Sequence, residues 1–240
     1  MSGGDKDGTT PLIRDNRKPV VFAAAGIFIF MILSRAKICA QQSDNTNLDS
    51  QFWPDTQANI RIAQNLNLVL FGTIRLGRNN SALVNEQAGI GLNRVWGKYL
   101  SSSVQYRYIN SEPTPERQAR EHRIHMDITP RIFLVHKFVL TDRNRVEWRD
   151  VNNRTSWRYR NRLQLERGMA LRQIKLTPYL AIEPFYDTRF KAWNRTQLFS
   201  GARVPITKHV TFDAFYMRQW DARVNPGFLH VIGAFWRLEF

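Results

Sequence analysis

The sequence is poor in cysteine, in lysine and in long hydrophobic runs. Its one cysteine, Cys39, excludes a disulfide framework and any zinc site built from several cysteines. No apolar stretch reaches the about 20 residues that a membrane-spanning helix needs, and the mean hydropathy is -0.41. A disulfide-stapled domain and a helical-bundle membrane protein are therefore excluded.

Basic residues outnumber acidic ones by 35 to 20, which gives a formal net charge of +15. Such a charge first suggests nucleic acid or an anionic membrane surface as a partner. Beyond residue 40, however, 24 of the 29 basic residues are arginines, and there is no lysine-rich run. Arginine suits ion pairs in confined places because its planar guanidinium binds a carboxylate through two hydrogen bonds. We therefore predict no nucleic-acid partner.

The N-terminal 40 residues resemble a secretory leader. Val20–Leu33 is an apolar stretch of 14 residues that follows a basic segment, which is typical of a signal peptide. We predict cleavage after Ala40, leaving a short N-terminal segment (41–50) before the folded domain (51–240). Lys37 argues against a lipoprotein signal around Cys39. An uncleaved membrane anchor is the alternative.

Apolar residues recur at every second position from Phe52 to Phe240, the period of strands with one polar and one apolar face. The segments have about 10 to 13 residues, which suits a tilted crossing of a bilayer. Eleven candidate strands begin near Phe52, Leu66, Val84, Leu100, His122, Phe138, Trp157, Ile174, Asn194, Val210 and Leu229.

Connection lengths alternate along this series. Tight turns are expected at 63–65, 96–98, 136–137 and 207–209, and longer polar loops at 111–120, 150–156 and 221–227. The pattern predicts an all-β fold, an antiparallel transmembrane β-barrel with short periplasmic turns and longer extracellular loops. Single-chain bacterial barrels have even strand numbers, so we expect the count of eleven to contain one wrong assignment. Either a further strand is hidden near Asn47–Asp55 or one of the eleven does not span, and we predict 10 to 12 strands. A soluble sandwich would have shorter strands.

The last segment, LHVIGAFWRLEF, carries an apolar residue at every second position from its terminal phenylalanine back to Ile232. Aromatic residues also gather near the ends of the predicted strands, as at membrane interfaces. The segment resembles the signal by which the outer-membrane assembly machinery recognises barrels. We therefore predict an outer-membrane location, with lipid and, transiently, that machinery as partners; the signal residues are Ile232, Ala234, Trp236, Leu238 and Phe240.

The polar face of the strands must be the lumen, because arginine at mid-depth in lipid costs about 2–4 kcal/mol. Either these charges satisfy one another and fill a narrow barrel, or surplus arginine lines a narrow, anion-preferring conduit. Arg149, Arg203 and Asp213 belong to the same face. The predicted lumen network comprises Arg107, Arg123, His125, Asp127, Arg131, Arg143, Arg145, Glu147, Arg158, Arg160, Arg162, Glu166, Lys175, Glu183 and Arg195.

A catalytic site is the competing hypothesis. Some outer-membrane barrels hydrolyse lipids with serine and histidine on the barrel wall, and His122, His125 and Asp127 with Ser101 or Ser103 would be the candidates. A histidine beside an aspartate on a polar face is more often part of a hydrogen-bonded network. We predict no catalytic residues, no metal ligands and no cofactor.

Several segments resemble an uncharacterised bacterial family, domain of unknown function 2490. They include QFWPDTQANIRI, LVLFGTIRLGRNNSALVNEQAGIGL, YRYINSEPTPERQAREHRIHMDITPR, DRNRVEWR, RYRNRLQLER, PYLAIEPFYD and WNRTQLFSGARV, together with the C-terminal strand. The resemblance covers nearly all of residues 51–240. It implies a barrel in the outer membrane, and the family has no established activity or site residues to carry over.

The sequence thus predicts a non-enzymatic outer-membrane barrel with an arginine-rich lumen, which serves as a structural protein or as a small passive conduit preferring anions. Two alternatives remain at this point. One is a lipid hydrolase on the barrel wall. The other is a signal-anchored basic domain that binds polyanions. The sequence does not identify a solute.

Overall fold

The computed structural model describes residues 47–240, so the predicted leader and its cleavage site lie outside the described residues. The described chain is almost entirely β-structure, with one short 3-10 helix at Val135–Lys137. No helix in this part of the chain combines the length and the apolar character that a membrane crossing requires.

The strands follow one another along the chain, and eleven of them are long. Their bounds are β1 (Leu48–Ala63), β2 (Leu66–Gly77), β3 (Ala82–Trp96), β4 (Leu100–Thr114), β5 (Arg117–Phe133), β6 (Phe138–Val151), β7 (Arg154–Arg167), β9 (Ile174–Asp187), β10 (Ala192–Pro205), β11 (Val210–Asp221) and β12 (Phe228–Glu239), with the three-residue β8 (Met169–Leu171) between β7 and β9.

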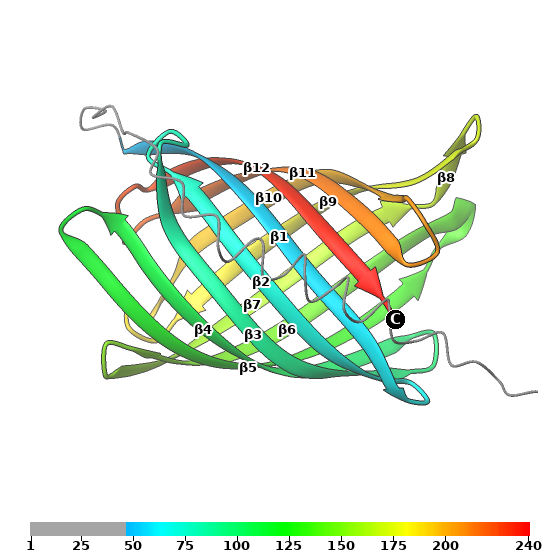
Figure 1. Cartoon of the computed structure of the whole chain (residues 1–240), viewed down its shortest axis with the longest axis horizontal. Helices are drawn as coiled ribbons and strands as arrows, with labels where there is room; N and C mark the ends of the chain where they lie inside the picture. Colours follow the sequence, from blue (N-terminus) through cyan, green and yellow to red (C-terminus); the bar gives the residue numbers. More distant parts are fainter. Residues whose placement is uncertain (1–46) are drawn as a thin grey trace, which may run out of the picture. The chain divides into compact units, whose positions relative to one another are not determined.

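The eleven long strands form one closed barrel (Figure 1). Neighbours along the chain pair antiparallel, and β1 pairs with β12 in parallel, from Leu48 opposite Phe228 to Asn59 opposite Glu239. A ring of antiparallel pairs alone needs an even number of strands, so one parallel pair allows eleven. All eleven predicted strands are therefore confirmed, and the expectation that one assignment was wrong is itself wrong.

Hydrogen bonds continue across this parallel seam to the end of β12. The Phe240 N–H donates to the Asn59 carbonyl at 2.9 Å, and the Phe240 carbonyl accepts from the Arg61 N–H at 2.9 Å. The Asn59 side-chain amide also donates to Glu239 at 2.7 Å. The predicted C-terminal signal residues therefore lie on the strand that closes the barrel.

Two of the three segments predicted as longer loops are tight hairpins. Within 111–120, β4 runs to Thr114 and β5 begins at Arg117; within 150–156, only Asn152 and Asn153 separate β6 from β7. Both asparagines adopt positive φ angles of 49° and 64°, a conformation that asparagine tolerates in turns. Polar composition suggested loops here, but backbone pairing continues through these residues. Residues 222–227 form the longest connection at this end.

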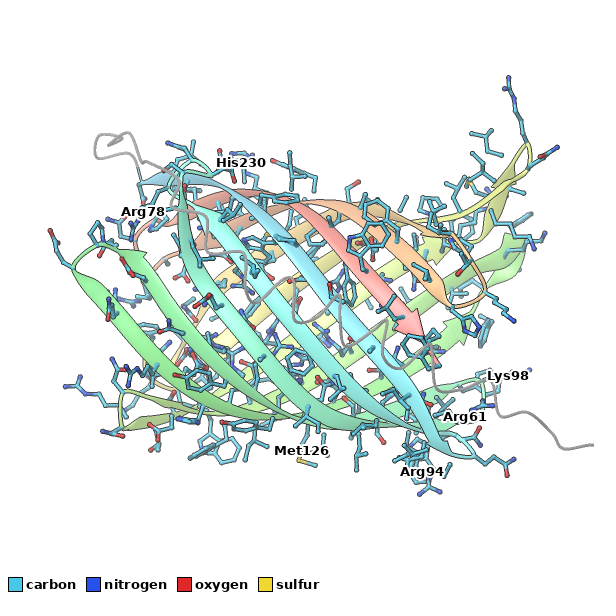
Figure 2. All side chains as sticks on the ribbon, in the orientation of Figure 1. Arg61, Arg78, Arg94, Lys98, Met126 and His230 are labelled. Atoms are coloured by element: carbon cyan, nitrogen blue, oxygen red, sulfur yellow. The ribbon has the colours of Figure 1, made fainter. Side chains whose placement is uncertain are left out.

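Side chains alternate across the barrel wall as the two-residue period predicts. On β5, Met126 and Ile128 are each 59% exposed on the outer face, whereas Asp127 between them faces inward and is buried. Figure 2 shows Met126 pointing away from the barrel. Further exposed apolar side chains lie on this outer face, among them Ile90, Leu92, Val104, Ile124, Val146, Leu163, Leu165, Leu180, Ile182, Leu198 and Ile232.

Glycines on the inner face leave room for aromatic rings on neighbouring strands. A Cβ at Gly89 would lie 2.0 Å from Phe71 Cζ, and a Cβ at Gly233 would lie 2.0 Å from Phe215 Cζ. The rings of these phenylalanines therefore lie against the backbone of the adjacent strand. This contact lines part of the lumen with ring faces and fixes the ring positions.

The contact between Phe215 and Gly233 predicts a stability effect. Gly233→Ala should lower the free energy of unfolding by about 1–3 kcal/mol, because the new methyl group overlaps the ring. Gly168→Ala is the control, since nothing lies within 4 Å of its added Cβ. Urea unfolding followed by heat-modifiable gel migration measures both variants, and equal midpoints would contradict the predicted overlap.

The parallel seam predicts a specific cross-link. In a Cys39→Ala chain, Ser50→Cys with His230→Cys should form a disulfide on mild oxidation, because the two positions are opposite in register. Ser50→Cys with Arg218→Cys is the control: Arg218 lies one strand further on, opposite His230, so the thiols are about 10 Å apart, beyond the reach of a disulfide. Non-reducing gels distinguish the two variants; cross-linking of the control alone would refute the register.

Candidate functional site

The lumen face of β6 carries Arg143, Arg145, Glu147 and Arg149 at every second position. The intervening Val146 points to the outer face and is 45% exposed. Strands β5, β7 and β9 repeat this arrangement, so the two-residue period concentrates ionisable groups on one wall of the interior. The site is therefore the arginine–carboxylate network of these four strands and the cavity beside it.

Asp127 and Arg145 form the best-defined ion pair of the network. Arg145 Nε lies 2.6 Å from Asp127 Oδ1, and Arg145 Nη2 lies 2.7 Å from Asp127 Oδ2. The residues are opposite in register on β5 and β6, and each is only 7% exposed. A guanidinium that binds both carboxylate oxygens in a buried place holds both side chains in one geometry.

Two fully buried glutamates connect the strands at the centre of the network. Glu183 accepts hydrogen bonds from Arg143 and Arg160, each at 2.7 Å. Glu147 lies 3.0 Å from Arg160 and 3.6 Å from Arg123. Because Arg160 contacts both carboxylates, it links β6 to β9 through β7.

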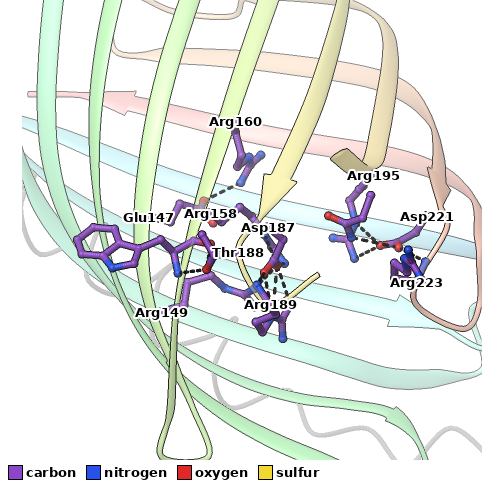
Figure 3. Close-up of polar contacts among 12 residues, drawn as sticks. Glu147, Arg149, Arg158, Arg160, Asp187, Thr188, Arg189, Arg195, Asp221 and Arg223 are labelled. Atoms are coloured by element: carbon purple, nitrogen blue, oxygen red, sulfur yellow. Dashed lines mark hydrogen bonds and ion pairs between the residues drawn. The ribbon is translucent and has the colours of Figure 1, made fainter. Parts of the chain in front are cut away.

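A second cluster lies toward the end of the barrel where β6 joins β7 (Figure 3). Glu121 binds both Nε and Nη2 of Arg149, at 2.6 and 2.7 Å. Asp187 is 2.7 Å from Arg158, 2.8 Å from Arg189 and 3.3 Å from Arg149. Arg149 therefore joins the two carboxylates.

Asp187 and Asp221 also fix the connections that follow their strands. The Arg189 N–H donates to Asp187 at 3.0 Å, and the Arg223 N–H donates to Asp221 at 2.9 Å. Asp221 additionally binds the Arg195 guanidinium at 2.6 Å. These aspartates couple the turns to the lumen network, as Figure 3 shows.

The network continues toward the opposite end with fewer members. Glu166 on β7 forms an ion pair with Arg203 on β10 and accepts a hydrogen bond from the Gln164 amide at 2.6 Å. The Tyr179 hydroxyl donates to Asp213 at 2.9 Å. Polar contacts therefore run along much of the length of the lumen.

A cavity of about 820 Å³ occupies the interior beside this network. Residues from all eleven long strands line it, including Asp49 and Arg117 toward one end and Arg131 and Glu239 toward the other. Fifteen arginines line the cavity, together with seven aspartates and glutamates and no lysine. The lining therefore carries a surplus of positive charge.

Part of this surplus comes from Arg75 and Arg107. Arg107 donates to the Gln87 side chain at 2.7 Å, and its guanidinium carbon lies 4.1 Å from the centre of the Phe71 ring. Arg75 lies 3.8 Å from the centre of the Trp53 ring. Among the described residues, neither arginine is within ion-pair distance of a carboxylate, and both Nε atoms are buried without a hydrogen-bond partner. The carboxylate of Asp55 acts on both at longer range.

The structure places most of the predicted lumen residues in the interior. Arg162 lies 3.9 Å from Glu183, and Arg131 is exposed at the end of the lumen, where it lines the cavity. Residues that form ion pairs are Arg123, Asp127, Arg143, Arg145, Glu147, Arg158, Arg160, Arg162, Glu166, Glu183 and Arg195.

Lys175 is an exception to the predicted network. It is exposed and lies where β9 pairs with β8, opposite Ala170. Because β8 pairs only with β9, this part of β9 extends beyond the closed wall, and its alternation no longer defines a lumen face. The prediction that Lys175 points into the lumen is therefore wrong.

The histidines predicted for a catalytic alternative do not come together. His122 faces outward and contacts the Tyr106 hydroxyl at 2.7 Å. His125 faces inward, is fully buried and has no hydrogen-bond partner at either ring nitrogen. Asp127 is held by Arg145, so the described residues contain no His–Asp hydrogen bond, and no group of metal ligands gathers in residues 47–240.

Several residues of the site were not predicted from the sequence. Glu121, Asp187 and Asp221 bind lumen arginines, and Asp55 and Arg75 line the cavity. The two-residue period places these residues on the lumen face, and this was the signal that could have identified them. The aspartates lie at strand ends, where they resemble loop residues.

The fold and interior define this protein as a closed β-barrel with a charged, arginine-rich lumen. A family model described as "Protein of unknown function (DUF2490)" matches residues 50–228, and the chain belongs to this family. No curated protein matches the sequence.

Two solved structures show some similarity to the chain. The beta domain of the Bordetella autotransporter Brka has 13% identity and a TM-score of 0.47, covering 69% of this chain and 81% of its own. LpxR from Salmonella typhimurium has 10% identity and a TM-score of 0.45, covering 72% and 83%. Both TM-scores are below 0.5, so these similarities carry no argument about the site.

The pair of Asp127 and Arg145 predicts a non-additive stability effect. Arg145→Met should cost about 3–5 kcal/mol of unfolding free energy, because it leaves a buried carboxylate without its partner. Asp127→Leu with Arg145→Met should recover most of that loss, since no isolated charge remains. Urea midpoints of the single and double variants provide the measurement. A double variant as unstable as the single one would contradict this account.

Proposed function

We propose that the protein is an outer-membrane β-barrel whose lumen selects small anions. The observation that carries this proposal is the charge of the lumen wall. Fifteen arginines and seven acidic side chains line the cavity, and four further carboxylates, Glu147, Glu166, Asp187 and Asp221, pair with lining arginines, so arginine remains in surplus. A barrel with a purely structural role needs no such surplus, because like charges in a confined space repel one another. Anions that enter the lumen would reduce this repulsion.

The outer surface supports a membrane location. Apolar side chains such as Met126, Ile128 and Leu180 are 59–61% exposed on the outer face, which is unfavourable in water and suits lipid. Tyr99, Trp96 and Trp193 are 49–59% exposed toward strand ends, where interfacial aromatic residues are expected. Ile232 and Trp236 of the predicted assembly signal are also exposed on β12.

The ion pairs and the surplus arginines have different roles in this proposal. Paired groups such as Asp127 and Arg145 hold the wall in place, since each satisfies the other. Among the described residues, Arg75 and Arg107 form no ion pair; the carboxylate of Asp55 acts on both only at longer range, so both can interact with a passing anion. The charges that act on Arg75 are those of Asp55 and of three arginines on other strands, Arg123, Arg160 and Arg195. Arginines therefore outnumber carboxylates around it.

Ion selectivity of the refolded protein in a planar bilayer tests the proposal. In a potassium chloride gradient, the reversal potential should indicate preference for chloride. Arg75→Gln with Arg107→Gln should shift the chloride-to-potassium permeability ratio about threefold toward one, because charge lining a narrow pore sets its selectivity.

Arg94→Gln is the matched control, since Arg94 is exposed on the outer face at a strand end (Figure 2). It should leave the reversal potential unchanged. A folded, heat-modifiable barrel that carries no current, or that prefers potassium, would refute the proposal.

A further inference from the structure

The cationic region of the lumen is built on aromatic rings. Seven aromatic side chains line the cavity, and four arginines have their guanidinium carbons close to the centres of such rings. The pairs are Arg75 with Trp53 at 3.8 Å, Arg162 with Phe199 at 4.0 Å, Arg107 with Phe71 at 4.1 Å and Arg160 with Phe185 at 4.3 Å.

The wall behind Phe71 holds this arrangement in place. The ring lies against Gly89 on β3, where a Cβ would approach within 2.0 Å. Arg107, from the next strand, then lies over the ring and donates to Gln87. Backbone, ring and guanidinium thus form three successive layers, and the outermost layer borders the cavity.

This layering presents planar cations to a ligand. One face of a stacked guanidinium contacts the ring behind it, and the opposite face is available to a second planar group. Its N–H edges can donate to an anion, and the Nε atoms of Arg75 and Arg107 are buried without a hydrogen-bond partner. A small inorganic anion would use only the edges, whereas a planar aromatic anion would use both the face and the edges.

The apolar residues on the other wall complement such a ligand. Trp53, Phe199 and Leu229 line the cavity and belong to one cluster of inward-facing residues, which also contains the fully buried Met217 and Val231. This cluster adds apolar surface to a lumen whose charged residues are concentrated on β5–β7 and also occur on β10, at Arg195 and Arg203. A ligand with an aromatic ring and a single carboxylate matches both kinds of surface.

We propose that the lumen binds planar aromatic carboxylates, through the guanidinium of Arg107 over Phe71 and that of Arg75 over Trp53. This inference rests on the proposed anion-selective lumen and names its preferred class of anion. The ring of the ligand stacks on the guanidinium and the apolar wall, and the carboxylate accepts hydrogen bonds from the arginine edges.

Calorimetric titration of the refolded full chain in a zwitterionic detergent tests this inference. Benzoate should bind about tenfold more tightly than cyclohexanecarboxylate, which has the same charge and similar size but no planar ring. Titration into protein-free micelles corrects for partitioning. Equal affinities for the two acids would overturn the inference.

Arg107→Lys is the decisive variant, because it keeps the positive charge and removes the planar guanidinium. It should abolish the preference for benzoate over cyclohexanecarboxylate. Arg94→Lys on the outer face is its control. Phe71→Leu and Phe199→Leu test the rings independently, and heat-modifiable migration verifies that each variant has folded.

The two proposals fail separately in these measurements. Chloride selectivity without a benzoate preference, or a preference that survives Arg107→Lys, overturns the aromatic-anion site and leaves the selective lumen standing. Benzoate binding that depends on Arg107 in a barrel without anion-selective current supports the site and refutes passage through the lumen.

Discussion

Pairing between β1 and β12 is the constraint on which the interior depends. Until these strands meet, the sheet has two open edges and no lumen, and the arginines of β5–β7 lie on an exposed face. Closure places the inward side chains of eleven strands around one axis. The seam is parallel because an odd number of strands cannot close with antiparallel pairs alone. Closure of the barrel therefore determines which side chains face the lumen and which face outward.

The closed wall then determines how the interior is filled. Glycine at positions such as Gly89 lets an aromatic ring lie against the backbone, and arginine stacks on that ring. Elsewhere, carboxylates such as Glu147 and Glu183 hold several arginines each at full burial. The stacking on aromatic rings and the ion pairs with carboxylates hold the arginine side chains at fixed positions in a confined space, where an unpaired charge is unfavourable. Arg75 and Arg107 line this space without an ion pair among the described residues.

Most of the fold was predictable because the two-residue period is a local property. The segment around Met126 and Ile128 shows which face is apolar, and each of the eleven strands was recognised in this way. The hairpins at 111–120 and 150–156 were not, because their polar residues resemble loops while the backbone still pairs. Lys175 followed the alternation correctly, yet it lies beyond the closed wall, where β9 pairs with β8.

The sequence by itself determined the class of fold, the polar face and the predominance of arginine, since periodicity and composition are carried by neighbouring residues. Tertiary structure decided the number of strands in the ring and the parallel seam, because closure involves segments 180 residues apart, such as Asn59 and Glu239. It also decided which arginines form ion pairs with carboxylates. Arg145 binds Asp127, whereas Arg107 lies over the Phe71 ring. The register between strands determines which contact each arginine makes.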